Sequence, residues 1–218
     1  MSFMAEGIDL SKGAVGAEYD WSKVMKPYPG RKVILPNGEE MIIEQASKDQ
    51  INEIVDALLI NVTHHKDLFD LVTSEIITEL YWWRENRPIA GLHPDSHFIL
   101  VGRVKGEIVG VTNGGLIDPK TGMSLHTVVR RDRRGLQIGA YLWPAKLEMW
   151  FDVLGCEKVY APPESAIGMR KLFRPWGFQL QPFPEKKHPG FYTPIALLTK
   201  EEWERLKPAK LVGELLKK

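Results

Sequence analysis

Apolar residues along the chain recur with two spacings, one typical of helices and one of strands. The clearest helical stripe follows Ser47, a residue type that often caps helices. Its apolar members fall at i, i+3, i+4, i+7, i+8 and i+11: Ile51, Ile54, Val55, Leu58, Leu59 and Val62. A second helix is predicted from about Asp67 to Asn86, and Pro88 ends it. The pattern therefore predicts two consecutive helices after a first strand at residues 41–43.

The middle of the chain alternates between apolar and polar residues instead. Residues 97–101 and 108–111 flank a Lys105-Gly106 turn and predict a β-hairpin, and residues 124–129 predict a third strand after a second reversal. The later elements are expected in the following order: a helix at about 135–154, a strand at 158–161, a short helix at 169–176, strands near 177–180 and 191–198, and terminal helices at 200–206 and 211–216. This order predicts an α/β fold with a mixed sheet and helices on both faces.

The two ends of the chain differ from the middle. Residues 1–38 are rich in glycine and proline but also carry Tyr19, Trp21 and Tyr28, so we expect an extended arm that packs on the domain or on a partner subunit rather than floating in water. The predicted organisation is this arm, one domain at residues 39–199 and a helical extension at residues 200–218. The arm is a candidate contact for a homo-oligomer or a partner subunit.

Composition excludes some classes of protein. Lysine and arginine number 29 against 28 aspartates and glutamates, so the net charge of +1 argues against nucleic acid as the main partner. No apolar run approaches the roughly 20 residues that span a bilayer, and the start lacks the pattern of a secretory signal. We therefore expect a cytoplasmic protein with no membrane partner. The single cysteine, Cys156, is expected to be a small buried residue.

The segment from Val129 to Ala140 carries the strongest chemical signal. A strand ends at Val129, four arginines follow, and a helix is expected to begin near Gly135. The first N–H groups of a helix have no internal partner and lie at its positive end, so a diphosphate could bind there. Gly139 would let the backbone approach the phosphates. By itself, however, the pattern also fits an ordinary tight turn beside a solvated basic face.

In this segment the chain resembles the GNAT acetyltransferase superfamily, over roughly residues 40–198. The family's pyrophosphate loop is matched at Arg134, Gly139 and Ala140, and the chain departs from it at Gln137, where a glycine is usual. The resemblance implies a largely antiparallel sheet of about seven strands, splayed near an acyl-CoA site, and it implies acetyl-CoA or another acyl-CoA as ligand and no metal. The residues implied to bind it are Val129, Arg134, Gly135, Leu136, Gln137, Ile138, Gly139 and Ala140.

The resemblance also implies a bulge at Val129, whose backbone would contact the acyl carbonyl. A second matching region, residues 159–178, departs from the family twice. Ser165 stands where asparagine is usual, and Phe173 stands where a tyrosine often protonates the leaving thiolate. A phenyl ring cannot donate a proton, so Tyr192 is a candidate replacement and His126 a candidate base. Both residues also fit ordinary structural roles.

These features favour an enzyme that transfers an acyl group from coenzyme A to the amine of a small molecule or protein, by direct attack. The alternatives are a non-transferring acyl-CoA-binding sensor or structural subunit, and another acyl-CoA reaction such as decarboxylation. The run Tyr81-Trp82-Trp83 fits either an aromatic wall of the acceptor pocket or a subunit contact. His64-His65 has no further ligands at helical spacing and predicts no metal site.

Overall fold

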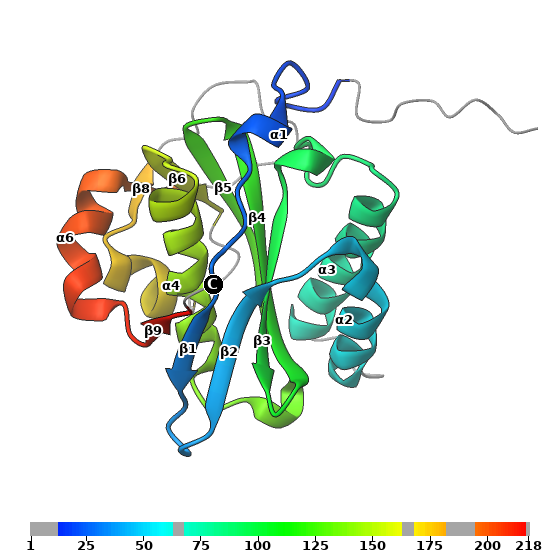
Figure 1. Cartoon of the computed structure of the whole chain (residues 1–218), viewed down its shortest axis with the longest axis vertical. Coiled ribbons are helices and arrows are strands. Elements are labelled where there is room, and N and C mark those ends of the chain that lie inside the picture. The colour runs from blue at the N-terminus through cyan, green and yellow to red at the C-terminus, as the bar shows by residue number, and fades with distance from the viewer. Residues whose placement is uncertain (1–12, 63–67, 163–167, 182–194, 217–218) are drawn as a thin grey trace, which may run out of the picture.

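The computed structural model describes residues 13–62, 68–162, 168–181 and 195–216, which build one nine-stranded sheet between two layers of helices (Figure 1). The strand order is β7-β8-β6-β5-β4-β3-β2-β1-β9. The strands are β1 (Arg31–Ile34), β2 (Glu40–Gln45), β3 (Phe98–Val104), β4 (Glu107–Asp118), β5 (Thr121–Val129), β6 (Lys158–Ala161), β7 (Gln179–Gln181), β8 (Ile195–Thr199) and β9 (Glu214–Leu215). Among these pairs only β5 and β6 run parallel, so the prediction of a mixed, largely antiparallel sheet is confirmed, with more strands than expected.

Two strands lie where we expected other structure. β1 falls within the range assigned to the arm. β9 lies at residues 214–215, so the terminal helix predicted at residues 211–216 is wrong. Gly213 adopts a left-handed conformation with φ of 86°, and a Cβ there would lie 2.2 Å from the carbonyl oxygen of Lys32. This turn ends the helical path and lets β9 pair with β1, opposite Arg31.

Helices cover both faces of the sheet. α2 (Ile51–Leu58) and α3 (Leu68–Arg84) lie on one face, and α4 (Ile138–Glu148) and α6 (Lys200–Lys210) lie on the other (Figure 1). The short α1 spans Trp21–Val24; π-helical turns span Met149–Val153 and Met169–Phe173, and 3₁₀ turns span Lys48–Gln50, Leu59–Asn61, Pro94–Ser96, Arg131–Arg133 and Arg174–Trp176. None of the helices in the described part of the chain is both long and apolar enough to cross a membrane.

The predicted stripe on α2 is buried up to the end of that helix. Ile51, Ile54, Val55 and Leu58 contact the core beneath α2 and α3. Leu59 and Val62, which the same spacing placed on the stripe, are about half exposed, at 50% and 46%. They leave the stripe because the α-helix ends at Leu58 and a tighter 3₁₀ turn follows.

The N-terminal segment packs on the domain itself. Trp21 and Tyr28 are each 3% exposed and belong to the core on the α4 face. The Trp21 indole donates a hydrogen bond to the carbonyl of Gly16, and the Tyr28 hydroxyl donates one of 2.7 Å to Glu148 on α4. The expected packing is confirmed for Trp21 and Tyr28 but not for Tyr19, which is 37% exposed and meets only the edge of Trp21. Association between copies of the chain stays a prediction.

The sheet opens beside β5. This strand pairs with β6 only through Thr121, Gly122 and Met123 and then continues to Val129 without it. Its register with β4 shifts between Ser124 and Thr127, so two residues of β5 face one residue of β4. The splay that we expected is present. The bulge, however, lies at residues 125–126 and not at Val129, because the register with β4 is regular from Thr127 onward.

Candidate functional site

The loop after β5 leads into α4 by an irregular path. A 3₁₀ turn at Arg131–Arg133 is followed by extended Arg134, and then by left-handed Gly135 and Gln137, with φ of 88° and 59°. Two left-handed residues cannot belong to a right-handed helix. α4 therefore begins at Ile138, three residues later than we expected.

The start of α4 presents backbone donors outward. The first bonded turn uses the N–H groups of Ala140 and Tyr141, which donate to the Gln137 carbonyl at 2.8 and 3.3 Å. The N–H groups of Ile138 and Gly139 precede that turn and lie at the positive end of the helix. A Cβ on Gly139 would meet only the Val129 side chain, at 3.6 Å. The side-chain position of Gly139 is therefore open to the approach of another group.

The four arginines of the loop do not share one role. Arg130 binds Asp132 at 2.8 Å, and Arg133 lies 3.5 Å from Glu39. These two guanidinium groups are partly neutralised by carboxylates, as expected of a solvated basic face. Arg134 is exposed at the mouth of the loop.

The backbone of Val129 faces the splay. The N–H of the next residue, Arg130, donates to Val109 on β4 at 3.0 Å. Backbone groups of successive strand residues point to opposite sides, so the Val129 N–H points away from β4. Buried Asn61 fixes this strand end, because its side chain donates to the Val129 carbonyl at 3.1 Å and accepts from the Arg131 N–H at 2.6 Å. No local sequence pattern identified Asn61.

A carboxylate and an imidazole meet at the bulge of β5. Glu79, on α3, has one oxygen 3.4 Å from Nε2 of His126 and accepts a 2.9 Å hydrogen bond from Asn113 with the other. Asn113 in turn accepts from the His126 backbone N–H, at 2.9 Å. The bulge thus turns His126 toward α3, an orientation that the sequence left open. Glu79 was missed, because its partners lie 34 and 47 residues away.

Both members of the pair are buried, and Glu79 is ionised. Burial alone would raise the pKa of Glu79, but hydrogen bonding and charge from His126, with the Asn113 amide, outweigh it and hold that pKa below its usual value. Burial lowers the pKa of nearby His97 to about 4, although the charge of Glu79 opposes the change. Glu79 is therefore a carboxylate and His97 a neutral ring at pH 7.

A hollow of about 300 Å³ opens over this pair. It is lined by Leu71, Ser74, Glu75, Thr78, Glu79, Trp82 and His126. Trp82 forms part of its wall. Its neighbour Trp83 is 7% exposed and belongs to the core.

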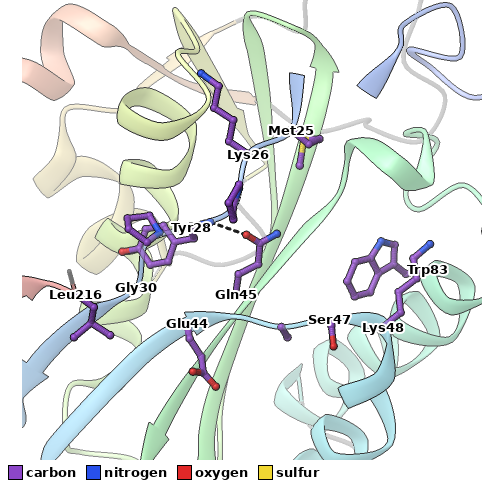
Figure 2. Close-up of a pocket in the computed structure, with 13 residues that line it drawn as sticks. Met25, Lys26, Tyr28, Gly30, Glu44, Gln45, Ser47, Lys48, Trp83 and Leu216 are labelled. Carbon is purple, nitrogen blue, oxygen red and sulfur yellow. Dashed lines mark hydrogen bonds between the residues drawn. The ribbon is translucent and has the colours of Figure 1, made fainter. Parts of the chain in front are cut away.

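A larger hollow of about 780 Å³ lies between the N-terminal segment and the β2–α2 connection (Figure 2). Figure 2 shows Lys26 and Met25 on one side and Lys48 and Trp83 on the other, with the Tyr28 N–H bonded to the Gln45 side chain. Lys48 binds Asn86, and Glu44 binds Arg103. These charged groups serve structural pairs and assemble no acid–base pair.

A buried ammonium lies behind the bulge, on the α4 face. Lys146 is fully buried, and its Nζ lies 3.2 Å from the carbonyl oxygens of both Asn113 and His126 and 3.3 Å from the Thr127 hydroxyl. A bulge leaves strand carbonyls without ladder partners, and an ammonium supplies three donors. Lys146 therefore holds the bulge in place.

Of the other residues singled out in the sequence, some lie in the core and the rest lie outside the described ranges. Phe173 is 7% exposed and packs against Trp143 and Phe178, with ring centroids 4.8 and 5.3 Å apart, so it contributes to the core. Cys156 is fully buried, as expected. Tyr192, Ser165 and the His64-His65 pair lie outside the described residues. Within the described ranges, no three His, Cys, Asp or Glu side chains gather as a metal site requires.

A model of the acetyltransferase (GNAT) family matches residues 61–178 of the chain, more than half of its length. The chain belongs to this family. The matched range contains α3, the β3–β5 meander, the loop and α4, so it spans both the Glu79–His126 pair and the start of α4. No curated protein matches the sequence.

Solved structures share the GNAT-like fold at low sequence identity. An uncharacterized protein from Bacillus halodurans has a TM-score of 0.55 and 12% identity and covers 83% of this chain and 95% of its own. Mycobacterium smegmatis RimJ, solved with CoA-disulfide, has a TM-score of 0.53 and 15% identity, with coverages of 85% and 97%. The spermidine/spermine N-acetyltransferase SpeG from Vibrio cholerae has a TM-score of 0.50 and 15% identity, with coverages of 76% and 96%. At these identities the similarity shows the fold alone.

Proposed function

We propose that the protein is an acyl-CoA-dependent N-acyltransferase that moves an acetyl group from coenzyme A to an amine. One observation carries the proposal: a single strand, β5, leads from the Glu79–His126 pair to the start of α4. Val129 at its end lies against Gly139, and His126, bound to Glu79, stands three residues earlier. At ~3.3 Å per strand residue, the backbones of His126 and Val129 lie about 10 Å apart.

Coenzyme A would be held by its pyrophosphate at the start of α4. The N–H groups of Ile138 and Gly139 supply donors, and Arg134 adds positive charge at the mouth of the loop. The residues that we propose for this role are Val129, Arg134, Gly135, Leu136, Gln137, Ile138, Gly139 and Ala140. Mycobacterium smegmatis RimJ, which shares the fold, was solved with CoA-disulfide, which supports the same class of ligand here.

The thioester supplies an acyl group whose transfer forms an amide bond, breaks the C–S bond and releases the coenzyme A thiol, so that the amine loses a proton. The Val129 N–H faces the splay and would donate to the acyl oxygen as it gains negative charge. The Glu79–His126 pair would receive the amine proton. Glu79, whose pKa lies below its usual value, would stay ionised and stabilise positive charge on His126.

The position of Phe173 favours a second candidate function. Its ring lies in the core and supplies no acid for the leaving thiolate, which suits a protein that binds acyl-CoA without transferring the group. A thiol with a pKa near 8.5 leaves without an acid, however, so transfer needs no residue in that role. Tyr192 stays a prediction for the acid.

Turnover of acetyl-CoA over a panel of amines tests the proposal. Acetylated amine, detected by mass, together with an equal amount of free thiol supports transfer. Binding of acetyl-CoA without any product contradicts transfer and supports the sensor, and thiol release that needs no amine supports another acyl-CoA reaction. Burial, with the charge of Asp118, raises the pKa of Cys156 to about 12, so a thiol reagent reports coenzyme A and not the protein.

A further inference from the structure

The hollow over the Glu79–His126 pair has a composition that selects among amines. Its seven lining residues include two carboxylates, Glu75 and Glu79, and no lysine or arginine. Glu79 is nearly buried, whereas the Glu75 side chain is 61% exposed at the rim. Lys146, the cation of the bulge, is fully buried on the opposite face of β5. The hollow therefore attracts a cation.

The two carboxylates lie close together, beside the same imidazole. Glu75 Oε2 and Glu79 Oε1 lie 3.9 and 3.4 Å from the same atom, Nε2 of His126. A chain with two separated ammonium groups would find a partner here for only one of them. A single ammonium in the hollow would face both carboxylates and lie next to the Glu79–His126 pair.

Apolar side chains flank these carboxylates on the same helix face. Leu71, Glu75, Thr78 and Trp82 are spaced i, i+4, i+7 and i+11 on α3, so they form one stripe with apolar residues at its ends. Trp82 is half-buried, and the Arg87 guanidinium lies 5.1 Å from its ring centroid. At about 300 Å³, the hollow is at the lower end of ligand sites.

We propose that the acceptor is a small primary monoamine with one apolar alkyl or aryl group, whose ammonium binds Glu75 and Glu79 and whose apolar part packs on Trp82. This inference rests on the proposed function and refines its acceptor. An α-carboxylate beside the amine would meet the two acidic residues and be repelled, so free amino acids are poor acceptors. Polyamines and peptides are the competing acceptor classes.

The test compares phenethylamine, ethylamine, phenylalanine and spermidine as acceptors, together with a short peptide that has a free amino terminus, at saturating acetyl-CoA. We expect kcat/KM for phenethylamine to exceed that for every other acceptor at least 10-fold. Trp82→Ala should raise KM for phenethylamine about 10-fold and leave ethylamine nearly unchanged, while Trp82→Phe restores most of the affinity. Glu75→Gln should raise KM for both monoamines.

Asp56→Asn serves as the matched control, because Asp56 is an exposed carboxylate on α2 outside the hollow; it should change none of these constants. Better turnover of spermidine, phenylalanine or the peptide than of phenethylamine overturns the acceptor class and leaves acyl transfer standing. If Trp82→Ala changes KM for phenethylamine and for ethylamine equally, the proposed acceptor class is overturned as well. If no amine is acetylated although acetyl-CoA binds, the proposed function fails, and the acceptor class fails with it.

Discussion

The ammonium group of Lys146 lies 3.2 Å from the carbonyl oxygen of His126, at the bulge of β5. It also binds the Asn113 carbonyl across the bulge, while the Asn113 side chain binds Glu79 on the other face of the sheet. One buried cation thus supports the strand segment from which His126 meets its carboxylate. We interpret Lys146 as a positioning residue that acts through the backbone of β5 and does not touch substrate.

Lys146→Met should destabilise the fold by roughly 3 kcal/mol, because it leaves two buried carbonyl groups without a donor while keeping most of the side-chain volume. Urea unfolding without ligand measures the change. Lys120→Met is the matched control, since the Lys120 side chain is 62% exposed, and it should cost less than about 0.5 kcal/mol. Equal losses for the two variants would show that the contacts of Lys146 with the bulge contribute nothing.

Stability should fall in mild acid because of His97. The pKa of this ring is lowered from 6.5 to about 4 by burial, so the unfolded chain binds a proton in this range that the folded protein excludes. The folded state then loses stability as the pH falls from 6.5 to 4, by at most roughly 3 kcal/mol. Unfolding at a series of pH values should show this slope, and His97→Leu should remove it.

The pH range of the loss distinguishes the contribution of His97 to stability from that of Glu79. The lowered pKa of Glu79 makes it a source of stability that is present above about pH 4.5 and lost below it as the pH falls. A His97→Leu variant that keeps the full slope between pH 6.5 and 4.5 would contradict the role of His97. Neither ring nitrogen of His97 has a well-formed hydrogen bond within the described residues, so the substitution should cost little at pH 7.

Gln137→Gly should stabilise the ligand-free protein by about 1 kcal/mol. Gln137 has φ of 59°, and a non-glycine residue in the left-handed region costs roughly 1–2 kcal/mol, which is partly offset by the greater freedom of glycine in the unfolded chain. Thermal unfolding measures the gain. Gln137→Val, a β-branched residue, should lower the melting temperature instead, and a lower melting temperature for Gln137→Gly would show that the backbone is not strained there.

Glu79→Gln should lower kcat at least 100-fold, because the amide keeps the shape of the carboxylate but cannot stabilise charge on His126. KM for acetyl-CoA should stay within about twofold, since the proposed cofactor site lies at the other end of the strand segment. Glu75→Gln is the comparison, and its effect on kcat should be much smaller because Glu75 is exposed and 3.9 Å from the imidazole. Equal kcat for Glu79→Gln and the wild type would remove the pair from the mechanism.

Local patterns predicted those parts of the fold that local chemistry decides. The stripe on α2, the turn at Lys105-Gly106 and the strand–loop–helix order around Gly139 depend on neighbouring residues, and all are present. β9 depends on Arg31, whose guanidinium binds the carbonyls of Val212 and Gly213 some 180 residues away. No window of sequence contains that contact, so the helix predicted there was wrong.

The candidate site also has one part that a local stretch of sequence predicts and one part that depends on distant contacts. The proposed anion-binding end of α4 was predicted from glycines and arginines within one loop, although the left-handed Gln137 moved the start of the helix. The bulge and the partners of His126 arise from the pairing of β5 with β4 and from the packing of α3, which bring Glu79 and Asn113 together. His126 was identifiable only as a residue type on a suitable strand.

The central claim is that coenzyme A binds through its pyrophosphate at the start of α4, and thermal unfolding with and without acetyl-CoA tests it most directly. At 100 times its dissociation constant, the ligand should stabilise the fold by about 2.7 kcal/mol. Gly139→Glu should abolish the shift in melting temperature, because it places bulk and negative charge where the phosphates would lie, and Arg134→Ala should only weaken it.

Two variants control for folding and charge in that measurement. Gly139→Ala should keep most of the shift, since its Cβ would lie at an ordinary 3.6 Å from Val129. Gln179→Glu should keep all of it, because Gln179 is an exposed residue of β7 outside the loop. The account predicts a shift for the wild type and both controls and none for Gly139→Glu. No shift for the wild type, or a full shift for a folded Gly139→Glu variant, would contradict it.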